Sequence, residues 1–153
     1  VEPGGRQCGC GNHGCLEALT GRQAIVDLAV RKLQEGRPSR LGDIVGAEHE
    51  QIDPRLIADQ ARDGDALCAE VMEEVGHYLG LAVCNIIVLC DPDKVILGGG
   101  IAAAGEVLFG SIRRTVRHAG RISRFDPANI VPAELGNRAG MVGAASLVWE
   151  HLA

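Results

Sequence analysis

Three cysteines near the start of the chain lie close enough in sequence to bind one metal ion. Cys8, Cys10 and Cys15 are separated mainly by glycines, in the sequence CGCGNHGC. Zinc takes four sulfur or nitrogen ligands in a tetrahedron, so three converging thiolates predict a zinc site that needs a fourth ligand from elsewhere. His13 is the local candidate, but in so short a loop we expect its imidazole to point outward. Buried reduced cysteines and a redox pair of Cys8 and Cys10 are the alternatives.

A glycine triplet is the second feature that could bind a ligand. Gly98, Gly99 and Gly100 follow a short β-branched run, 94–97, and precede a helical pattern. Glycines between a strand and a helix let backbone amides approach an anion or a nucleotide at the positive end of the helix. The alternative is a tight turn with no ligand.

Amphipathic helices must position the cysteine loop. Residues 1–14 are rich in glycine and predict an irregular loop. A helical pattern begins at Cys15, breaks near Thr20–Gly21 and continues to Gly36. Residues 37–51 look like a linker, and Asp53–Pro54 is a typical start for a short helix that runs to about Arg62.

The longest predicted element is a helix that Asp65 caps and Asp91–Pro92 ends. Its apolar residues recur at spacings of three and four, and beyond Gly80 it is apolar on nearly all sides, so we expect this end to be buried on most faces. The remaining cysteines lie on this helix and are most simply core residues; they are Cys68, Cys84 and Cys90.

The order of the later elements predicts an α/β fold. After the strand at 94–97 we expect a helix at about 103–118, a strand at 130–133 and a closing helix at 138–151, with small residues on one side of the last. Two strands are fewer than an open α/β sheet normally has. We therefore expect that strands are missing and that the chain is the C-terminal piece of a longer protein.

Composition excludes several classes of protein. The chain has 153 residues, 46% of them hydrophobic, and a net charge of −5. It has enough apolar residues for a core, and an acidic chain without clustered basic residues is not expected to bind nucleic acid directly. The longest strongly apolar stretch, 80–90, is shorter than the roughly 20 residues that cross a bilayer. We expect a soluble, cytoplasmic protein that binds no membrane.

Three motifs resemble those of one family. Residues 8–17, CGCGNHGCLE, are similar to the zinc signature of the ROK family (repressors, open reading frames and sugar kinases). The segments 94–101, KVILGGGI, and 135–145, LGNRAGMVGAA, resemble the strand and glycine turn on the adenosine side and the closing helix of the family. In the family a histidine upstream of the cysteines is the fourth zinc ligand, and its position falls before Val1.

The resemblance implies a fold, a domain layout and a set of site residues. The fold would be the C-terminal lobe of an actin-like, hexokinase-type (ribonuclease H-like) fold, helix-rich and with few strands. Residues 1–153 would be the C-terminal part of a ROK domain, with a zinc knuckle and sugar-side loop at 1–17 and a nucleotide side at 94–153. Glu17 matches the family's sugar-binding glutamate, and a carboxylate that accepts from two vicinal hydroxyls is orientation-specific. Its alternative role is to stabilise the start of a helix.

The family then implies an ATP-dependent hexose kinase with structural zinc and with ATP and magnesium as ligands. We expect the substrate to be a hexose or amino-hexose and the whole protein to be a homo-oligomer that includes an N-terminal lobe absent here. ROK kinases place the catalytic aspartate and a DGT-like phosphate loop in the N-terminal half, so no catalytic residue is expected in this chain, which alone should be inactive. The alternatives are the effector lobe of a ROK transcriptional repressor and an isolated zinc-stabilised interaction module.

Overall fold

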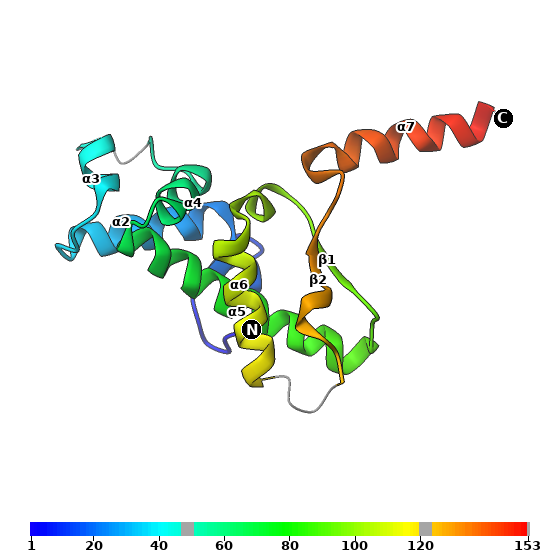
Figure 1. Ribbon diagram of the computed structural model, residues 1–153, viewed down its shortest axis with the longest axis horizontal. Helices are drawn as coiled ribbons and strands as arrows, with labels where there is room; N and C mark the ends of the chain where they lie inside the picture. The colour runs from blue at the N-terminus through cyan, green and yellow to red at the C-terminus, as the bar shows by residue number, and fades with distance from the viewer. Residues whose placement is uncertain (47–50, 120–123, 153) are drawn as a thin grey trace.

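The computed structural model describes residues 1–46, 51–119 and 124–152 (Figure 1). These residues form a helical body, a two-stranded sheet beside it and a last helix that projects away from the body. The elements, in chain order, are α1 (Leu16–Thr20), α2 (Arg22–Gln34), α3 (Arg40–Val45), α4 (Pro54–Arg62), α5 (Ala66–Cys90), β1 (Val95–Leu97), the 3-10 helix η2 (Gly100–Ala104), α6 (Glu106–Ala119), the 3-10 helix η3 (Pro127–Asn129), β2 (Ile130–Pro132), the 3-10 helix η4 (Gly136–Arg138) and α7 (Ala139–Leu152).

Helix α5 is the frame of the body, and both of its ends lie where the sequence predicts. Asp65 accepts a hydrogen bond from the backbone N–H of Cys68 at 2.9 Å, and it also accepts from the Ser39 hydroxyl at 2.9 Å and the Arg40 N–H at 2.7 Å. At the other end Asp91 takes a left-handed conformation with φ 42°, which ends the helix. Asp65 therefore caps α5 and also holds Ser39 and Arg40, at the start of α3, against the beginning of α5.

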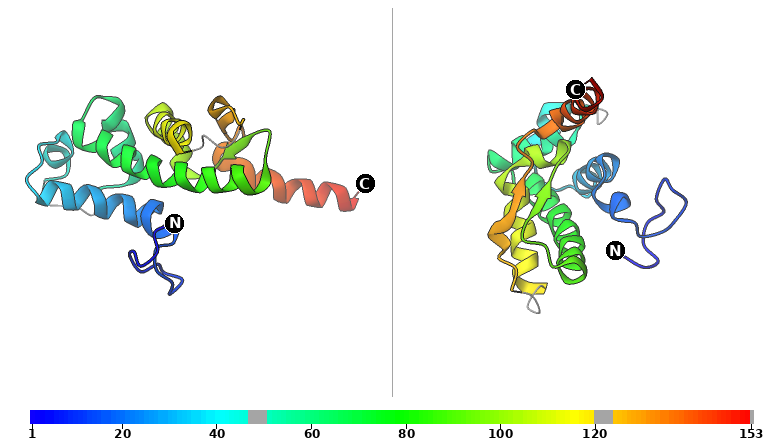
Figure 2. Two further views of the ribbon diagram at one scale, coloured as in Figure 1. Left: turned by 90° about the horizontal axis from the view of Figure 1, so that it is seen from below. Right: turned by 90° about the vertical axis from the view of Figure 1, so that its right-hand side faces the viewer.

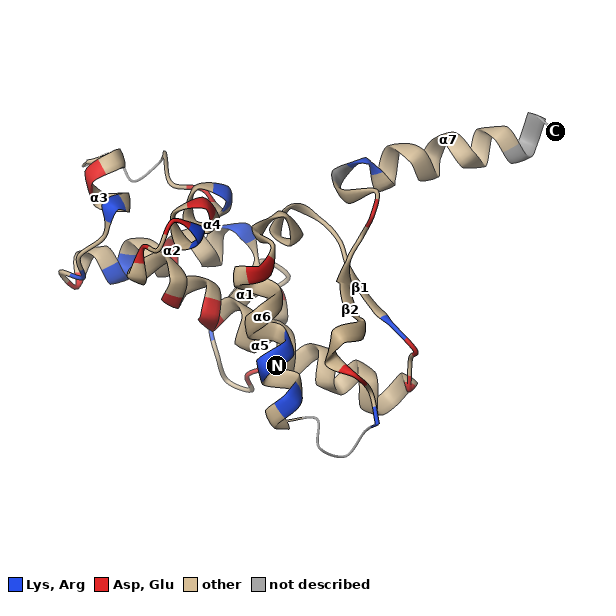
Figure 3. Ribbon diagram, in the orientation of Figure 1, with Lys and Arg blue, Asp and Glu red and all other residues tan. Residues whose placement is uncertain are grey.

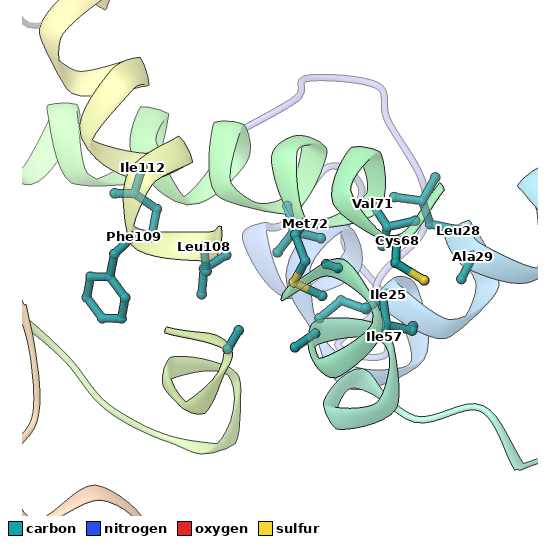
Figure 4. Close-up of a cluster of buried hydrophobic side chains, with 14 of the residues drawn as sticks. Ile25, Leu28, Ala29, Ile57, Cys68, Val71, Met72, Leu108, Phe109 and Ile112 are labelled. Carbon is teal, nitrogen blue, oxygen red and sulfur yellow. The ribbon is translucent and has the colours of Figure 1, made fainter. Parts of the chain in front are cut away.

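The hydrophobic core surrounds α5. Helices α1 and α2 pack on one side of it and α4 and α6 on another (Figure 2). Buried side chains of α2, α4, α5 and α6 pack together in one cluster (Figure 4); they include Ile25, Leu28, Ala29, Ile57, Cys68, Val71, Met72, Leu108, Phe109 and Ile112.

Two glycines of α5 permit the close approach of α6. A Cβ on Gly76 would lie 2.5 Å from the Ser111 Cβ, and a Cβ on Gly80 would lie 2.5 Å from the Thr115 Cβ. Any side chain at either position would therefore push the two helices apart. Helix α6, which follows the glycine turn and η2 in the chain, is in this way held directly against α5.

The sheet is a parallel pair of short strands. Val95 pairs with Ile130 and Leu97 with Pro132. Val95 and Ile130 are both buried in the core, whereas Ile96 is 63% exposed on the opposite face. Arg113 of α6 donates to the Ile130 carbonyl at 2.9 Å and so ties β2 to the body.

Two of the expected boundaries were wrong. The region 37–51 is not all linker, because Ser39 accepts from the Leu41 N–H and caps α3, whose Leu41 side chain is fully buried. The glycine triplet leads into η2 before α6 begins at Glu106, because Gly105 takes a positive φ of 68° and separates the two helices. Other predicted helices and both strands were confirmed to within a few residues.

The burial of the C-terminal end of α5 was also predicted wrongly. Val88 is 60% exposed and Leu89 is 83% exposed, because no described element packs over that side of the helix. Cys68 and Cys84 are core residues as expected, but Cys90 is exposed.

Helix α5 also has the length and apolar composition that a membrane span requires. Its buried face packs against α6, α4 and α2 in the body, as in the core helix of a globular protein. This packing accounts for the apolar residues on the buried face of α5, but not for the exposed ones near its C-terminal end.

Candidate functional site

The cysteine loop is a small hairpin held by backbone hydrogen bonds. Gln7 and His13 form an isolated antiparallel bridge. Inside it the Cys8 N–H donates to the Asn12 carbonyl at 2.8 Å, and the Gly11 N–H donates to the Cys8 carbonyl at 2.9 Å. Gly11 has a φ of 89°, a conformation that favours glycine, so the reversal depends on it.

This hairpin brings the three sulfur atoms together. The ligand atoms of Cys8, Cys10 and Cys15 lie within 4.8 Å of one another, and the Cys10 and Cys15 sulfurs are 3.6 Å apart. A tetrahedral zinc ion with Zn–S bonds of about 2.3 Å separates its sulfur ligands by roughly 3.8 Å. The separation of the Cys10 and Cys15 sulfurs is close to this value, and the third sulfur is near enough for all three thiols to bind one zinc ion.

The pKa values of two of these thiols move in opposite directions. A hydrogen bond from the Asn12 backbone N–H, followed by those from Cys15 and Cys8, lowers the pKa of Cys10. The hydrogen bond with Cys10, together with burial, raises the pKa of Cys15 to about 11. Metal binding must displace the proton of Cys15, so the affinity of the loop for zinc falls as the pH falls.

The histidines stand apart from the cluster. His13 is exposed, and in the described part of the chain no other His, Cys, Asp or Glu ligand atom joins the three sulfurs. The outward position expected for His13 is therefore what the structure has. His118 Nδ1 lies 2.8 Å from the Arg114 carbonyl, and His77 Nδ1 lies 3.5 Å from the Thr115 hydroxyl.

Glu17 lies in the first turn of α1, immediately after the cysteine loop, and is exposed. Among the described residues, no side-chain hydrogen bond or ion pair is made to its carboxylate, which leaves both oxygens available to a ligand. Its backbone carbonyl accepts from the Gly21 N–H at 2.8 Å, and a Cβ on Gly21 would lie 2.6 Å from that oxygen. The tight turn at Gly21 thereby fixes α1 relative to α2.

The glycine turn is open to solvent. Gly98, Gly99 and Gly100 are all exposed, and Gly99 has a φ of 84°. No atom lies within 4 Å of a Cβ built on Gly99 or Gly100. The positive φ explains why a glycine is needed at position 99, and the space above the turn leaves room for a ligand.

A cavity of about 840 Å³ connects the glycine turn with the end of α1. Its size is that of a small-molecule or cofactor site. The side of η2 that carries Gly100 and Ile101 forms one wall, and α4 and the α1–α2 turn form the others; the lining residues outside η2 are Thr20, Gly21, Arg22, Ile25, Asp53, Pro54, Arg55, Ala58, Asp59 and Arg62.

Sequence reasoning missed this cavity. The break at Thr20–Gly21 and the cap at Asp53 are visible in the sequence, but only as helix boundaries. Arg22 and Arg55 lie at the starts of two different helices. Nothing in the sequence indicates that they line the same cavity as Gly100.

The fold and the site define an α/β lobe in which a three-cysteine loop and a strand–glycine turn are joined by one long helix. The model of the ROK family matches residues 1–151, and the chain belongs to this family. The glucokinase of Thermotoga maritima is 36% identical over 99% of this chain and 48% of its own length. The DNA-binding transcriptional dual regulator NagC of Escherichia coli K12 is 32% identical over 97% of this chain and 35% of its own length.

Solved structures give the same result. A ROK family glucokinase from Streptomyces griseus, in complex with glucose and AMPPNP, superimposes with a TM-score of 0.83 at 30% identity, over 96% of this chain and 48% of that one. A ROK family transcriptional regulator that is a homologue of the E. coli MLC protein has a TM-score of 0.71 at 34% identity, over 86% of this chain and 32% of that one. The actin-like, helix-rich α/β fold is thus confirmed, and the chain spans about half the length, or less, of these relatives.

Proposed function

We propose that this chain is the C-terminal part of an ATP-dependent hexose kinase that resembles glucokinase. The observation that carries the proposal is the cavity between Gly100 and the Thr20–Gly21 turn, three residues beyond Glu17. A nucleotide beside the glycine turn and a sugar beside Glu17 would then be held by neighbouring parts of one lobe. The AMPPNP and glucose in the S. griseus glucokinase support this assignment.

In this proposal the cysteine loop positions the sugar-binding carboxylate. Cys8, Cys10 and Cys15 would hold a structural zinc ion, with a fourth ligand from outside the described residues. Because α1 begins directly after Cys15, fixing the loop also fixes Glu17, which would accept hydrogen bonds from two vicinal hydroxyls of a hexose or amino-hexose.

The nucleotide side would be formed by the turn and the cavity. Backbone amides at Gly98, Gly99 and Gly100 can approach a nucleotide closely because they carry no side chains. The apolar residue Ile101, which is only partly buried, lines the same cavity and suits the flat face of a base. ATP would bind as its magnesium complex, whose metal ion offsets the charge of the phosphates.

Phosphoryl transfer would require the rest of the protein. The proposal assigns no catalytic residue to this chain, and the general base and the phosphate loop would belong to the upstream half. The 153-residue chain alone would then be inactive. The full-length protein would be a cytoplasmic homo-oligomer.

A second candidate function is the sugar-effector lobe of a ROK transcriptional repressor. The similarity to NagC and to the MLC homologue favours it. A repressor needs the sugar side but need not retain a nucleotide site, so ATP binding separates the two. The upstream sequence separates them as well, because a helix-turn-helix there would indicate a repressor.

Calorimetry on the full-length protein tests the proposal. We expect glucose or another hexose and, separately, AMPPNP to bind, and Gly99→Val to weaken AMPPNP binding while hexose binding is retained. Gly36→Val is the matched control, because Gly36 also has a positive φ, 80°, and no atom within 4 Å of a built Cβ, but it lies at the far end of α2. Full-length protein that binds hexose but no nucleotide would contradict the kinase and favour the repressor.

A further inference from the structure

Arg113 of α6 connects the start of its own helix with the sheet. Its Nη1 donates to both carboxylate oxygens of Glu106, in the first turn of α6, at 2.9 Å each. Its Nη2 donates to the carbonyl of Ile130 in β2, also at 2.9 Å. The guanidinium carbon lies 5.5 Å from the ring centroid of Phe109, within the range of a cation–π contact. One side chain thus links two segments that are far apart in the sequence.

These contacts compensate for the burial of a charge. The Arg113 side chain is only 20% exposed, and its Nε is buried and has no hydrogen-bond partner among the described residues. A guanidinium that leaves water loses hydration, and hydrogen-bond acceptors in the protein must replace it. Arg113 therefore cannot turn away from Glu106 or Ile130 without leaving further N–H groups unpaired. Lysine does not replace it, because an ammonium group lacks the planar fork that reaches both partners.

The segment that joins β1 to α6 has two points at which the backbone can turn. Residues 95–105 include no charged residue, whereas α6 has an acidic first turn and is basic farther along (Figure 3). Gly99 and Gly105 have φ values of 84° and 68° and flank the 3-10 helix η2. Gly100 and Ile101 of η2 line the cavity. The position of this cavity wall therefore depends in part on how the two ends of the segment are held.

Arg113 fixes these two ends relative to each other. At the β1 end, the strand pair holds the segment, and the Ala133 N–H, just beyond β2, donates to the Leu97 carbonyl at 2.9 Å. At the other end, Glu106 directly follows the second of the two glycines. Because Arg113 bonds to both Ile130 and Glu106, it sets the distance between the strand pair and the start of α6.

We propose that Arg113 is a positioning residue for nucleotide binding, which holds Glu106 and β2 together and so keeps η2 and the glycine turn in place as a wall of the cavity. Arg113 does not itself line the cavity, so it acts through these segments and not by touching the ligand. The inference rests on the proposed assignment of the cavity to ATP. The sugar side should be spared when these contacts are loosened, because Glu17 belongs to α1, which packs on α5.

Two substitutions in the full-length protein test the role of Arg113. Arg113→Lys keeps the charge but not the fork, and Glu106→Gln keeps the size of a side chain that is 77% exposed, so its variant should fold. In calorimetry each should weaken AMPPNP binding roughly 10-fold and leave hexose affinity unchanged. Arg114→Lys is the matched control, because Arg114 is the next residue and pairs with Glu73 of α5 instead, at 2.5 Å. It should change neither affinity.

Hydrogen exchange in the ligand-free, full-length protein provides a readout that needs no nucleotide. The amides of Ala102 and Gly105 are hydrogen-bonded within η2 and should exchange roughly 10-fold faster in Arg113→Lys and Glu106→Gln than in the unaltered protein. The amides of α5 should exchange at the same rate in all of them.

Three results would overturn the proposal. Unchanged exchange in η2 would mean that Arg113 does not hold the segment, and unchanged AMPPNP affinity would mean that holding it does not matter for the nucleotide. Equal losses of AMPPNP and hexose affinity would show that Arg113 only stabilises the fold in general. Failure of the kinase assignment itself is distinguishable from these, because the unaltered full-length protein would then bind no AMPPNP, and a role in nucleotide binding would be excluded with it.

Discussion

The cap of α5 allows a stability prediction whose size follows from the hydrogen bonds. Asp65 accepts from three donors, the Cys68 N–H, the Ser39 hydroxyl and the Arg40 N–H, and it is buried. Loss of a helix cap costs about 1 kcal/mol, and each further hydrogen bond to a charged group contributes about 1.5 kcal/mol. Asp65→Ala should therefore lower the free energy of unfolding by about 3 to 4 kcal/mol.

Asp53 supplies the matched control. It caps α4 through a single hydrogen bond from the Leu56 N–H at 2.8 Å, so Asp53→Ala should cost only about 1 kcal/mol. Urea unfolding of the full-length protein and of both variants, followed by circular dichroism, measures the two losses. Equal losses would refute the reasoning, because they would mean that the contacts of Asp65 with Ser39 and Arg40 contribute nothing.

The same carboxylate predicts a dependence on pH. Burial raises the pKa of Asp65, but the hydrogen bonds from Cys68, Ser39 and Arg40 outweigh burial, so the net shift of the pKa is downward. A carboxyl whose pKa is lower in the folded state stabilises the fold fully above its unfolded pKa, and the contribution is lost as the pH falls through the folded pKa. Asp65→Asn should remove this acid-sensitive part of the stability, and an unchanged pH profile would contradict the assignment.

Three further predictions concern the site and its frame. Glu17→Gln in the full-length protein should weaken hexose binding roughly 10- to 100-fold and leave AMPPNP binding unchanged in calorimetry; unchanged hexose affinity with reduced thermal stability would instead favour a role in stabilising α1. Cys10→Ser should reduce the zinc content measured by elemental analysis, and equal zinc in both proteins would exclude the cysteine loop as the site. Gly76→Ala should destabilise the protein by about 1 to 3 kcal/mol through overpacking against Ser111, whereas Gly110→Ala, which meets only side-chain ends at 3.4 Å or more, should be tolerated in the same unfolding assay.

Local signals in the sequence predicted most elements because those elements depend on local interactions. Asp53 and Asp65 cap helices through backbone donors three residues further along the chain, and the Gly98–Gly100 turn follows its strand directly. The proximity of Cys8, Cys10 and Cys15 was predictable for the same reason, since a loop of eight residues rich in glycine can fold back on itself.

The features that could not be predicted depend on contacts between distant segments. Arg22, Arg55 and Gly100 meet at one cavity only because α2, α4 and η2 pack around the same body. The exposure of Leu89 was not predicted. An apolar sequence indicates that a helix face packs against something, but it does not indicate whether the packing residues belong to this chain. The fourth zinc ligand and the catalytic base that we propose would lie outside these 153 residues, so their positions could not be predicted from this sequence either.

Hexose-dependent phosphoryl transfer is the most direct test of the proposed function. Full-length protein, loaded with zinc and given magnesium, ATP and glucose or another hexose, should release ADP at a rate that depends on the sugar, and the 153-residue chain should release none. A full-length protein that binds the sugar tightly but releases no ADP with any hexose or amino-hexose would contradict the kinase and identify the lobe as the sugar sensor of a regulator.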